Sequence, residues 1–548
     1  MLTKEQEAAV NHVYGPMMVV AGPGSGKTMV LTRRIQKLLE YTAPERIMVI
    51  TFARKAAEEM KQRFAAFTDG ETAEKVWFGT FHSIFFRLLR RWNIVDEQTT
   101  ILDEEGEEKL RKTLSRDSEG SPAFFMCQRD VYEAEKKKRN LMDFEDIINQ
   151  MAEEIKHHTL WRQFDFFLID EFQDINMAQY EIVCQMVGER NPNLFVVGDE
   201  DQAIYAFRGS KPELFLAFPK DFPNCPRLDL RYNFRCQAQV VAAAAELISH
   251  NQQRFEKTLQ AVKKAEKKIA VRPVFDEEME ARLIRRAIFW RHRRGLPYDH
   301  MAVLCRTRAQ LRNIKAALQE GGIPFICPYD FAYTDHHDAL LVEEDLKRIS
   351  ELAQEPGNLD AFKSVMKLFP FLQESGDFRR LAKREDILKG LSEQNKLSAS
   401  QRREVIELKR RLNKGKKFSQ QGQYLQWLLQ TDYLTYAYSK IKERELSRFT
   451  VWKQIWRYYR PNKKGVNLLT MHGAKGLEFE WVWIAGLEDG ECPRREAADS
   501  REKLEEERRL LYVAITRAKR ELTLSFYDGF SRKKSRFLKE MEQSLSNV

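Results

Sequence analysis

The segment AGPGSGKT, residues 21–28, has three glycines, a lysine and a threonine at the spacing of a phosphate-binding loop. It follows an apolar run and precedes a helical pattern, so a strand, a loop and a helix succeed one another. Backbone N–H groups of such a turn surround phosphate oxygens, and a helix N-terminus favours their negative charge. Lys27 is spaced to reach the β- and γ-phosphates, and the Thr28 hydroxyl to bind Mg²⁺. The predicted phosphate-binding residues are Ala21 (where the strict pattern has glycine), Gly22, Pro23, Gly24, Ser25, Gly26, Lys27 and Thr28.

A second acidic motif, FFLIDEFQD, ends another apolar run. Asp170 at the end of that strand is predicted to bind Mg²⁺, and Glu171 to polarise the attacking water. Two solvated acids that merely follow a strand are the alternative, and the phosphate-binding loop argues against it.

The loop GDEDQAIYAFRGS joins two kinds of chemistry. Gln202 can contact a phosphate, and three residues later Tyr205, Phe207 and Arg208 form a set suited to stacking on bases. Phosphoryl transfer also needs cations, and Arg235 and Arg517 are the candidates, although an isolated arginine is more often a surface charge.

The elements that must position these residues form two α/β regions. Apolar strands alternate with helical patterns, which predicts parallel sheets with ligands at their carboxyl edges. We expect two parallel-sheet domains, each with a mainly helical insertion. The predicted bounds are 1–84 with 140–224 for the ATP-binding domain, 85–139 for its insert, 225–328 with 465–548 for the second domain, and 329–464 for the second insert.

Composition restricts the class of protein. The 548 residues carry a net charge of +10, which mildly favours a polyanionic partner. Seven scattered cysteines without a C-x-x-C pair offer no zinc or iron–sulfur spacing and suit a reducing compartment. No apolar run approaches the length of a membrane span, and the charged N-terminus has no targeting core. We therefore expect a cytoplasmic protein with no membrane association.

The order of the motifs resembles that of superfamily 1A helicases of the UvrD/Rep/PcrA type. The matching segments are LTKEQ, AGPGSGKT, TFARKAAEEM, GTFHS, LMDFEDII, LIDEFQD, VVGDEDQAIYAFRGS, LRYNFRC, TMHGAKGLEFE and EEERRLLYVAITRAK. They cover nearly the whole chain, and the resemblance implies that both parallel-sheet domains are RecA-like.

The resemblance implies roles on the nucleotide side, with ATP and Mg²⁺ as ligands. Gln6 would recognise adenine, and Phe234, where the family usually has tyrosine, would stack on it. Gln202 would sense the γ-phosphate, Arg235 and Arg517 would be arginine fingers, and Glu478 would contact the sugar or its surroundings. The implied catalytic residues are Lys27, Glu171, Gln202, Arg235 and Arg517.

The resemblance also implies a path for single-stranded DNA, lined by Phe52, Thr80, His82, Tyr205, Phe207, Arg208 and His472. Phe207 replaces the tryptophan most common in such enzymes. Two alternatives stay open: Phe52 and Phe207 could be core aromatics, and the two histidines could simply be satisfied by hydrogen bonds. Asp143 and Asp146 are expected to orient a loop, and residues 505–507 to begin a solvated helix.

The function so implied is an ATP-dependent helicase that moves 3′ to 5′ on single-stranded DNA and acts at single-strand/duplex junctions, in DNA repair, replication or antiviral defence. One alternative is a DNA-stimulated ATPase switch without processive unwinding. Another is a motor subunit of a larger nuclease or antiphage complex, in which the second insert would bind the protein partner. The chain is shorter than typical members, and a fused nuclease domain is not expected.

Overall fold

The computed structural model describes residues 2–103, 106–107, 110–111, 114, 122–158, 160–188, 193–266, 268–328, 464–528 and 533–546. Residues 1–321 and 469–548 form one compact unit, and residues 322–468 form another. Nearly all of the second predicted insert therefore lies outside the described residues. No helix in the described part is both long and apolar enough to cross a bilayer.

The first sheet has six strands, all paired in parallel. Their order is β3 (Trp77–Thr80), β2 (Ile47–Thr51), β6 (Phe166–Ile169), β7 (Leu194–Gly198), β1 (Met17–Ala21) and β8 (Arg227–Leu230). Because β6, β7 and β1 are neighbours, the loops at their carboxyl ends meet at one edge of the sheet. Those loops carry the predicted phosphate-binding and acidic motifs.

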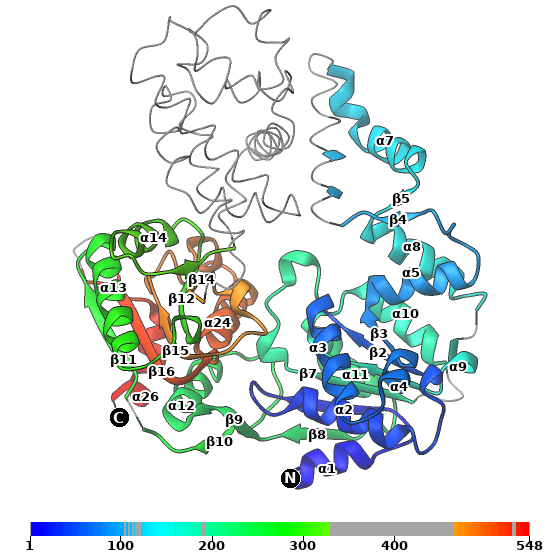
Figure 1. The fold of residues 1–548 in the computed structure, drawn as a ribbon, viewed down its shortest axis with the longest axis horizontal. Coiled ribbons are helices and arrows are strands. Elements are labelled where there is room, and N and C mark those ends of the chain that lie inside the picture. The colour runs from blue at the N-terminus through cyan, green and yellow to red at the C-terminus, as the bar shows by residue number, and fades with distance from the viewer. Residues whose placement is uncertain are drawn as a thin grey trace, which may run out of the picture. The chain divides into compact units, whose positions relative to one another are not determined.

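Both faces of this sheet are covered by helices (Figure 1), as its wholly apolar strands predict. Alternate strand residues enter two separate cores, since successive side chains point to opposite faces. One core includes α1 (Lys4–Asn11), α2 (Lys27–Leu38) and α3 (Arg54–Ala65). The other includes α5 (Phe81–Arg91), α8 (Phe144–Glu154), α10 (Met177–Val187) and α11 (Pro212–Asp221).

The second sheet also has six strands, and its β11–β16, β16–β15, β15–β12 and β14–β13 pairs are parallel. Their order is β11 (Ala270–Val274), β16 (Ala518–Tyr527), β15 (Phe479–Ile484), β12 (Met301–Cys305), β14 (Val466–Thr470) and β13 (Phe325–Ile326). The helices around it are α12 (Ala238–Ile248), α13 (Glu277–Arg293), α14 (Leu311–Glu320), α24 (Arg501–Ile515), α25 (Arg536–Glu540) and α26 (Glu542–Ser546). The two predicted parallel sheets are thus confirmed.

Short elements complete the described part. Two small parallel pairs join β9 (Tyr232–Gln237) with β10 (Gln260–Lys263), and β4 (Thr100–Ile101) with β5 (Leu141–Met142). The remaining α-helices are α4 (Gly70–Lys75), α7 (Pro122–Lys138) and α9 (Leu160–Gln163). Single 3₁₀ turns that matter for the site are η2 (Phe172–Asp174), η3 (Glu200–Gln202), η4 (Ala206–Arg208) and η7 (His472–Ala474).

Two predicted domain boundaries do not match the limits of the first sheet and its helices. The boundary at 84/85 cuts α5, and Phe85, Leu88 and Leu89 are buried in the core of the first sheet. The boundary at 224/225 precedes β8, which pairs with β1 and so belongs to the first sheet. A polar edge strand such as RLDL lacks the apolar run that marks the interior strands, which is why the sequence did not reveal it.

Candidate functional site

The phosphate-binding loop connects the buried strand β1 to α2 in the first sheet. Gly24 and Gly26 have φ of 67° and 86°, a region that side chains with a Cβ rarely occupy. The loop is held from outside as well: the Gln6 amide Nε2 donates to the Ser25 carbonyl at 2.9 Å. Lys27 opens α2 directly after this turn, so the first N–H groups of the helix, which lack partners within it, are adjacent to the loop.

Lys27 forms an ion pair with Glu171, at 3.0 and 3.1 Å from its two carboxylate oxygens. Glu171 adopts a left-handed backbone, with φ of 51°, directly after β6. Burial alone would raise its pKa, but Lys27 and Lys475 outweigh this and lower the pKa to about 2. Glu171 is therefore ionised at neutral pH, the state that a group polarising water requires.

The pKa of Asp170, the residue before Glu171, is shifted in the opposite direction. Burial and the negative charge of Glu171 raise the pKa of Asp170 to about 7. Its carboxylate accepts a hydrogen bond from the Glu171 N–H at 3.0 Å. A buried carboxylate whose ionisation is disfavoured gains from a hard cation with oxygen ligands, so Asp170 fits Mg²⁺, with the Thr28 hydroxyl as the second predicted ligand.

The strand β9 lies against the phosphate-binding loop. The Asn233 amide donates to the Pro23 carbonyl at 2.7 Å, and the Phe234 N–H donates to the Gly24 carbonyl at 2.9 Å. A Cβ on Gly24 would lie 2.5 Å from the Arg235 Cβ. The loop and β9 can approach this closely only because residue 24 is glycine. The Phe234 ring is 40% exposed, as a stacking surface for a base must be.

Both predicted arginine fingers lie near this loop and have partners within the protein. Arg235 Nε contacts Glu478 Oε2 at 2.6 Å, so Glu478 is an ion-pair partner of a predicted finger. Arg517 is 2% exposed and donates to the carbonyls of Val513 and Leu477. Burial and the neighbouring Arg235 lower the pKa of Arg517 to about 9, which leaves it cationic at neutral pH.

The loop after β7 is fixed by a buried cluster of charges. Asp199, Glu200 and Asp201 are fully buried, and the Lys257 ammonium group contacts all three. Arg254 forms a bidentate pair with Asp201, with contacts of 3.0 and 2.8 Å. Burial disfavours the charge of Lys257, but the three carboxylates raise its pKa above the ordinary value. Three consecutive acids therefore serve to hold η3 rather than to bind a metal ion.

Gln173 connects the acidic motif to this loop. Its amide Nε2 donates to Glu171 Oε2 at 2.6 Å, and its Oε1 accepts the Asp199 N–H at 2.9 Å. Asp199 in turn accepts a hydrogen bond from the Gln202 amide at 2.5 Å. Gln173 is completely buried, so both bonds are shielded from water. A continuous chain of hydrogen bonds thus leads from Glu171 to Gln202.

Lys475 makes a second connection, from the loop before β15. Its ammonium group contacts the Asp174 carboxylate, donates to the Gln202 carbonyl at 2.8 Å and lies 4.7 Å from the Tyr205 ring centre. One cation of the second sheet thus contacts both the acidic motif and the aromatic end of the loop.

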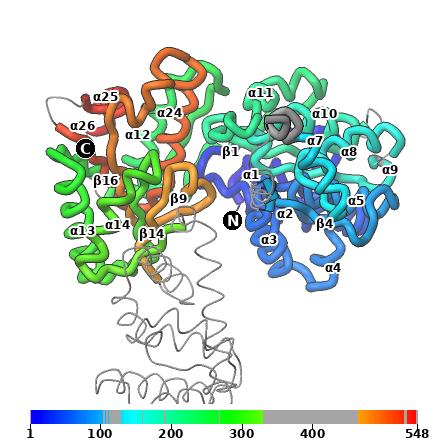
Figure 2. Tube along the Cα trace, turned by 90° about the horizontal axis from the view of Figure 1, so that it is seen from above, coloured from blue at the N-terminus to red at the C-terminus, as the bar shows by residue number. Residues whose placement is uncertain are grey.

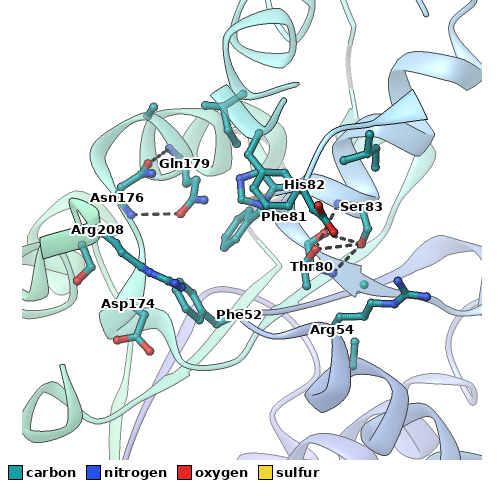
Figure 3. Close-up of a pocket in the computed structure, with 18 of the residues that line it drawn as sticks. Phe52, Arg54, Thr80, Phe81, His82, Ser83, Asp174, Asn176, Gln179 and Arg208 are labelled. Carbon is teal, nitrogen blue, oxygen red and sulfur yellow. Dashed lines mark hydrogen bonds between the residues drawn. The ribbon is translucent and has the colours of Figure 1, made fainter. Parts of the chain in front are cut away.

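A groove of about 1160 Å³ lies beside the aromatic end of this loop. Five predicted DNA-path residues line it: Phe52, Thr80, His82, Tyr205 and Arg208. Figure 3 shows Phe52 and Arg208 on one side of the groove and Thr80 and His82 on the other. The Thr80 hydroxyl caps α5, which fixes where that helix begins at the groove wall.

The aromatic residues form a continuous series. Phe52 stacks on Tyr205 with ring centres 5.2 Å apart, Tyr205 contacts the edge of Phe207, and Phe207 contacts His472 at 5.6 Å. Phe207 is 67% exposed, so the structure excludes it from the core. All seven predicted DNA-path residues are therefore brought together, in or next to one groove.

The two histidines of this region are neutral. Burial lowers the pKa of His82 to about 4, and burial together with Arg306 and Lys475 lowers that of His472 to about 4. His82 stacks on the Phe144 ring at 4.3 Å. Among the described residues neither imidazole has a hydrogen-bond partner, and each contacts an aromatic ring instead.

The prediction of a solvated helix start at residues 505–507 is wrong. Glu505 accepts hydrogen bonds from the backbone of Gln252 and Gln253, and Glu507 forms a bidentate pair with Arg306. Glu506 accepts the Ala206 N–H at 3.2 Å and so holds the turn that carries Phe207. Their partners lie about 200 to 300 positions away, and composition alone carried no signal of them.

Asp143 and Asp146 cap a helix and bind a buried lysine, and their expected role in orienting a loop stays a prediction. Asp143 caps α8 by accepting the Asp146 N–H at 2.9 Å, and both carboxylates contact the buried Lys136. Gln173, Lys257, Lys475 and Glu506 were missed as site residues, although all except Lys257 lie inside motifs that were recognised.

Comparison with known proteins agrees with this geometry. A family model described as the UvrD/REP helicase N-terminal domain matches residues 2–123 and 108–223, and one described as the UvrD-like helicase C-terminal domain matches residues 228–338 and 344–529. YjcD of Bacillus subtilis is 31% identical, over 98% of this chain and 80% of its own length. Proteins named ATP-dependent DNA helicase PcrA are 29% identical in Staphylococcus epidermidis and 28% in Staphylococcus aureus, over 99% of this chain and 87% or 86% of theirs. The chain belongs to the UvrD-like helicase family.

Proposed function

We propose that this protein is an ATP-dependent DNA helicase that moves 3′ to 5′ along single-stranded DNA and separates strands at single-strand/duplex junctions. Family membership supports the activity, and relatives named ATP-dependent DNA helicase support the substrates. One observation carries the mechanism: the loop from Asp199 to Tyr205 joins the Glu171 hydrogen-bond chain to the aromatic groove within seven residues.

In the proposed nucleotide site, Gln6 and Phe234 hold adenine, while residues 21–28 hold the phosphates. Mg²⁺, held by Thr28 and Asp170, would neutralise charge on the phosphates. Glu171 orients and polarises the attacking water. Lys27 contacts the β- and γ-phosphates in place of its present partner Glu171, which frees that carboxylate to act.

Arg235, Arg517 and Gln202 complete the site around the γ-phosphate. The arginines stabilise the charge that spreads over the transferring group. Glu478 is the ion-pair partner of Arg235 until a bound nucleotide replaces the Glu478 carboxylate, because a triphosphate is a stronger partner than one carboxylate. The role first expected for Glu478, contact with the nucleotide sugar, stays a prediction.

The proposed DNA path is the groove from Thr80 and His82 to Phe207 and His472. Bases stack on the exposed ring of Phe207, and Arg208 contacts the phosphate backbone. When the γ-phosphate leaves, Gln202 loses a partner, and the loop that holds Tyr205 can shift. Stacking on the strand then changes with each turnover, which is the step that moves the protein.

Strand displacement from tailed duplexes tests this function. The expected result is ATP-dependent displacement from a duplex with a 3′ single-stranded tail and none from a 5′-tailed duplex. Hydrolysis stimulated by DNA without displacement from either substrate would instead assign the protein as an ATPase switch. Hydrolysis at one rate with and without DNA would reject both functions.

The cellular role is proposed more broadly, as DNA repair, replication or antiviral defence. Among the described cysteines, Cys184, Cys225, Cys236 and Cys492 are free thiols, which supports work in the reducing cytoplasm. A nuclease or repair partner bound through residues 329–464 remains a prediction. Co-purification at fixed stoichiometry, lost when that segment is removed, would support it.

A further inference from the structure

The outer face of α13 gathers arginines and exposed aromatic rings in one strip. This strip (Arg282, Arg286, Phe289, Trp290 and Arg293) lies within about 100° of arc on the helix, since each residue advances by about 100°. Phe289 is 43% and Trp290 48% exposed, and their rings meet edge to face at 5.6 Å. The Arg293 guanidinium lies 5.4 Å from the Phe289 ring centre. Cation and ring are therefore interleaved on the surface.

The ordinary reasons for such residues do not explain this strip. Cations in the last turn of a helix stabilise its dipole, which accounts for Arg293 but not for Arg282 or Arg286. Arg282 pairs with Glu278, yet Arg286 and Arg293 have no carboxylate partner in the described part of the chain. The inner face of α13 already supplies the core contacts, through Ala281, Ile284 and Ile288. Two adjacent aromatic rings left outside that core indicate a binding surface.

The strip is separated from the nucleotide site by the second sheet itself. On β15, Val482 and Ile484 enter the core with α12 and α24, while Trp481 points the other way and receives Arg291 of α13 at 4.3 Å. Figure 2 shows α13 and α14 on one side of that sheet and α12 and α24 on the other. Because α24 leads to Arg517 and contacts η3, the strip cannot belong to the groove already described.

We propose that the outer face of α13 is a second binding surface for single-stranded DNA, distinct from the groove, which holds the strand displaced from the duplex. This inference rests on the proposed function, because only an unwinding enzyme generates that second strand. Unpaired bases offer faces on which Trp290 and Phe289 stack, and Arg286 and Arg293 contact the phosphates between them. A duplex hides those base faces, so the surface selects single strands.

Binding stoichiometry tests the proposal directly. Native mass spectrometry of the full chain with oligo(dT) of about ten nucleotides, a length in the range one such site covers, should give two oligonucleotides per chain. Trp290→Ala, and separately Arg286→Ala with Arg293→Ala, should weaken the second binding event about tenfold or more and leave the first unchanged. Tyr14→Ala, a 62% exposed aromatic on the first-sheet side, is the matched control and should leave both events intact.

The outcomes separate this inference from the proposed function. One oligonucleotide per chain, or a second event insensitive to Trp290→Ala, overturns the second surface even if DNA still stimulates hydrolysis. If a blunt duplex binds at Trp290 as tightly as oligo(dT) does, the proposed selectivity of the strip for single strands is overturned. Binding of oligo-glutamate in place of oligo(dT) would assign the strip to an acidic protein. Two bound oligonucleotides without stimulated hydrolysis would reject the helicase and the displaced strand as the occupant, while the strip would still be a second site for single-stranded DNA.

Discussion

The two sheets share an architecture but differ in the chemistry at their carboxyl edges. The edge of the first sheet carries the glycine loop, the ionised Glu171 and the Gln173–Asp199–Gln202 hydrogen bonds. The second sheet and the adjacent β9 contribute cations instead, Arg235, Arg517 and Lys475. In the proposed function, groups that bind and activate are thus separated from groups that stabilise developing charge. The proposal implies that the rate of hydrolysis depends on how the two sheets approach each other.

The largest expected effects come from removing one cation from each side. Lys27→Ala should abolish both tight nucleotide binding and hydrolysis, because the phosphates lose their direct cationic partner. Arg517→Ala should lower kcat by about 10³-fold and leave nucleotide affinity nearly unchanged, since a finger acts on charge that develops in the transition state. Measured ATP affinity and DNA-stimulated kcat distinguish the two. Equal loss of affinity in both variants would contradict the division between the sheets.

Removing the amide of Gln173 should uncouple ATP hydrolysis from DNA binding in the groove. Gln173→Leu keeps the volume but loses both hydrogen bonds, including one to a charged carboxylate, so DNA-stimulated kcat should fall about 10- to 100-fold. Nucleotide affinity should persist. Gln239→Leu, at a buried glutamine of α12, is the matched control for the loss of a buried amide. An equal fall in the control would reduce Gln173 to a packing residue.

Phe207→Ala tests the DNA side of the loop. Loss of one stacking surface should weaken single-strand binding about 5- to 150-fold and depress DNA stimulation, while nucleotide binding stays intact. Because Phe207 is 67% exposed, thermal unfolding should shift little. A large loss of stability would contradict the exposed position, and unchanged DNA affinity would remove Phe207 from the path.

The smallest effect concerns pH. The pKa values of His82 and His472, lowered by burial to about 4, keep both imidazoles neutral from pH 8 down to pH 5.5. Single-strand affinity at constant salt should therefore stay flat over that range, and cationic imidazoles should add to it only near pH 4. Histidines of ordinary pKa, about 6.5, would tighten DNA binding already between pH 7 and 5.5. Fluorescence anisotropy of labelled oligo(dT) distinguishes these cases.

The sequence predicted those parts of the site that depend on short, local spacing. The glycine loop, the strand-end acids and the order of aromatic residues after Gln202 are all adjacent in the chain, and the structure places them together. It did not reveal partners far apart in sequence, such as Lys257 among residues 199–201 or Glu506 at Ala206. The sequence of a charged helix does not show whether one of its glutamates is solvated or buried. The edge strand β8 and the extent of α5 were missed because pairing and burial, not composition, define them.

Gly198 shows how narrowly this arrangement is fitted. A Cβ there would lie 2.7 Å from Gln173 Oε1 and 3.0 Å from the Phe215 ring, so even alanine would force the amide out of place. Such a variant is expected to bind nucleotide, because residues 21–28 are untouched, yet to lose DNA-stimulated hydrolysis as Gln173→Leu does. Position 198 is therefore restricted to glycine by the side chains of Gln173 and Phe215, at a distance from the loop that would hold the phosphates.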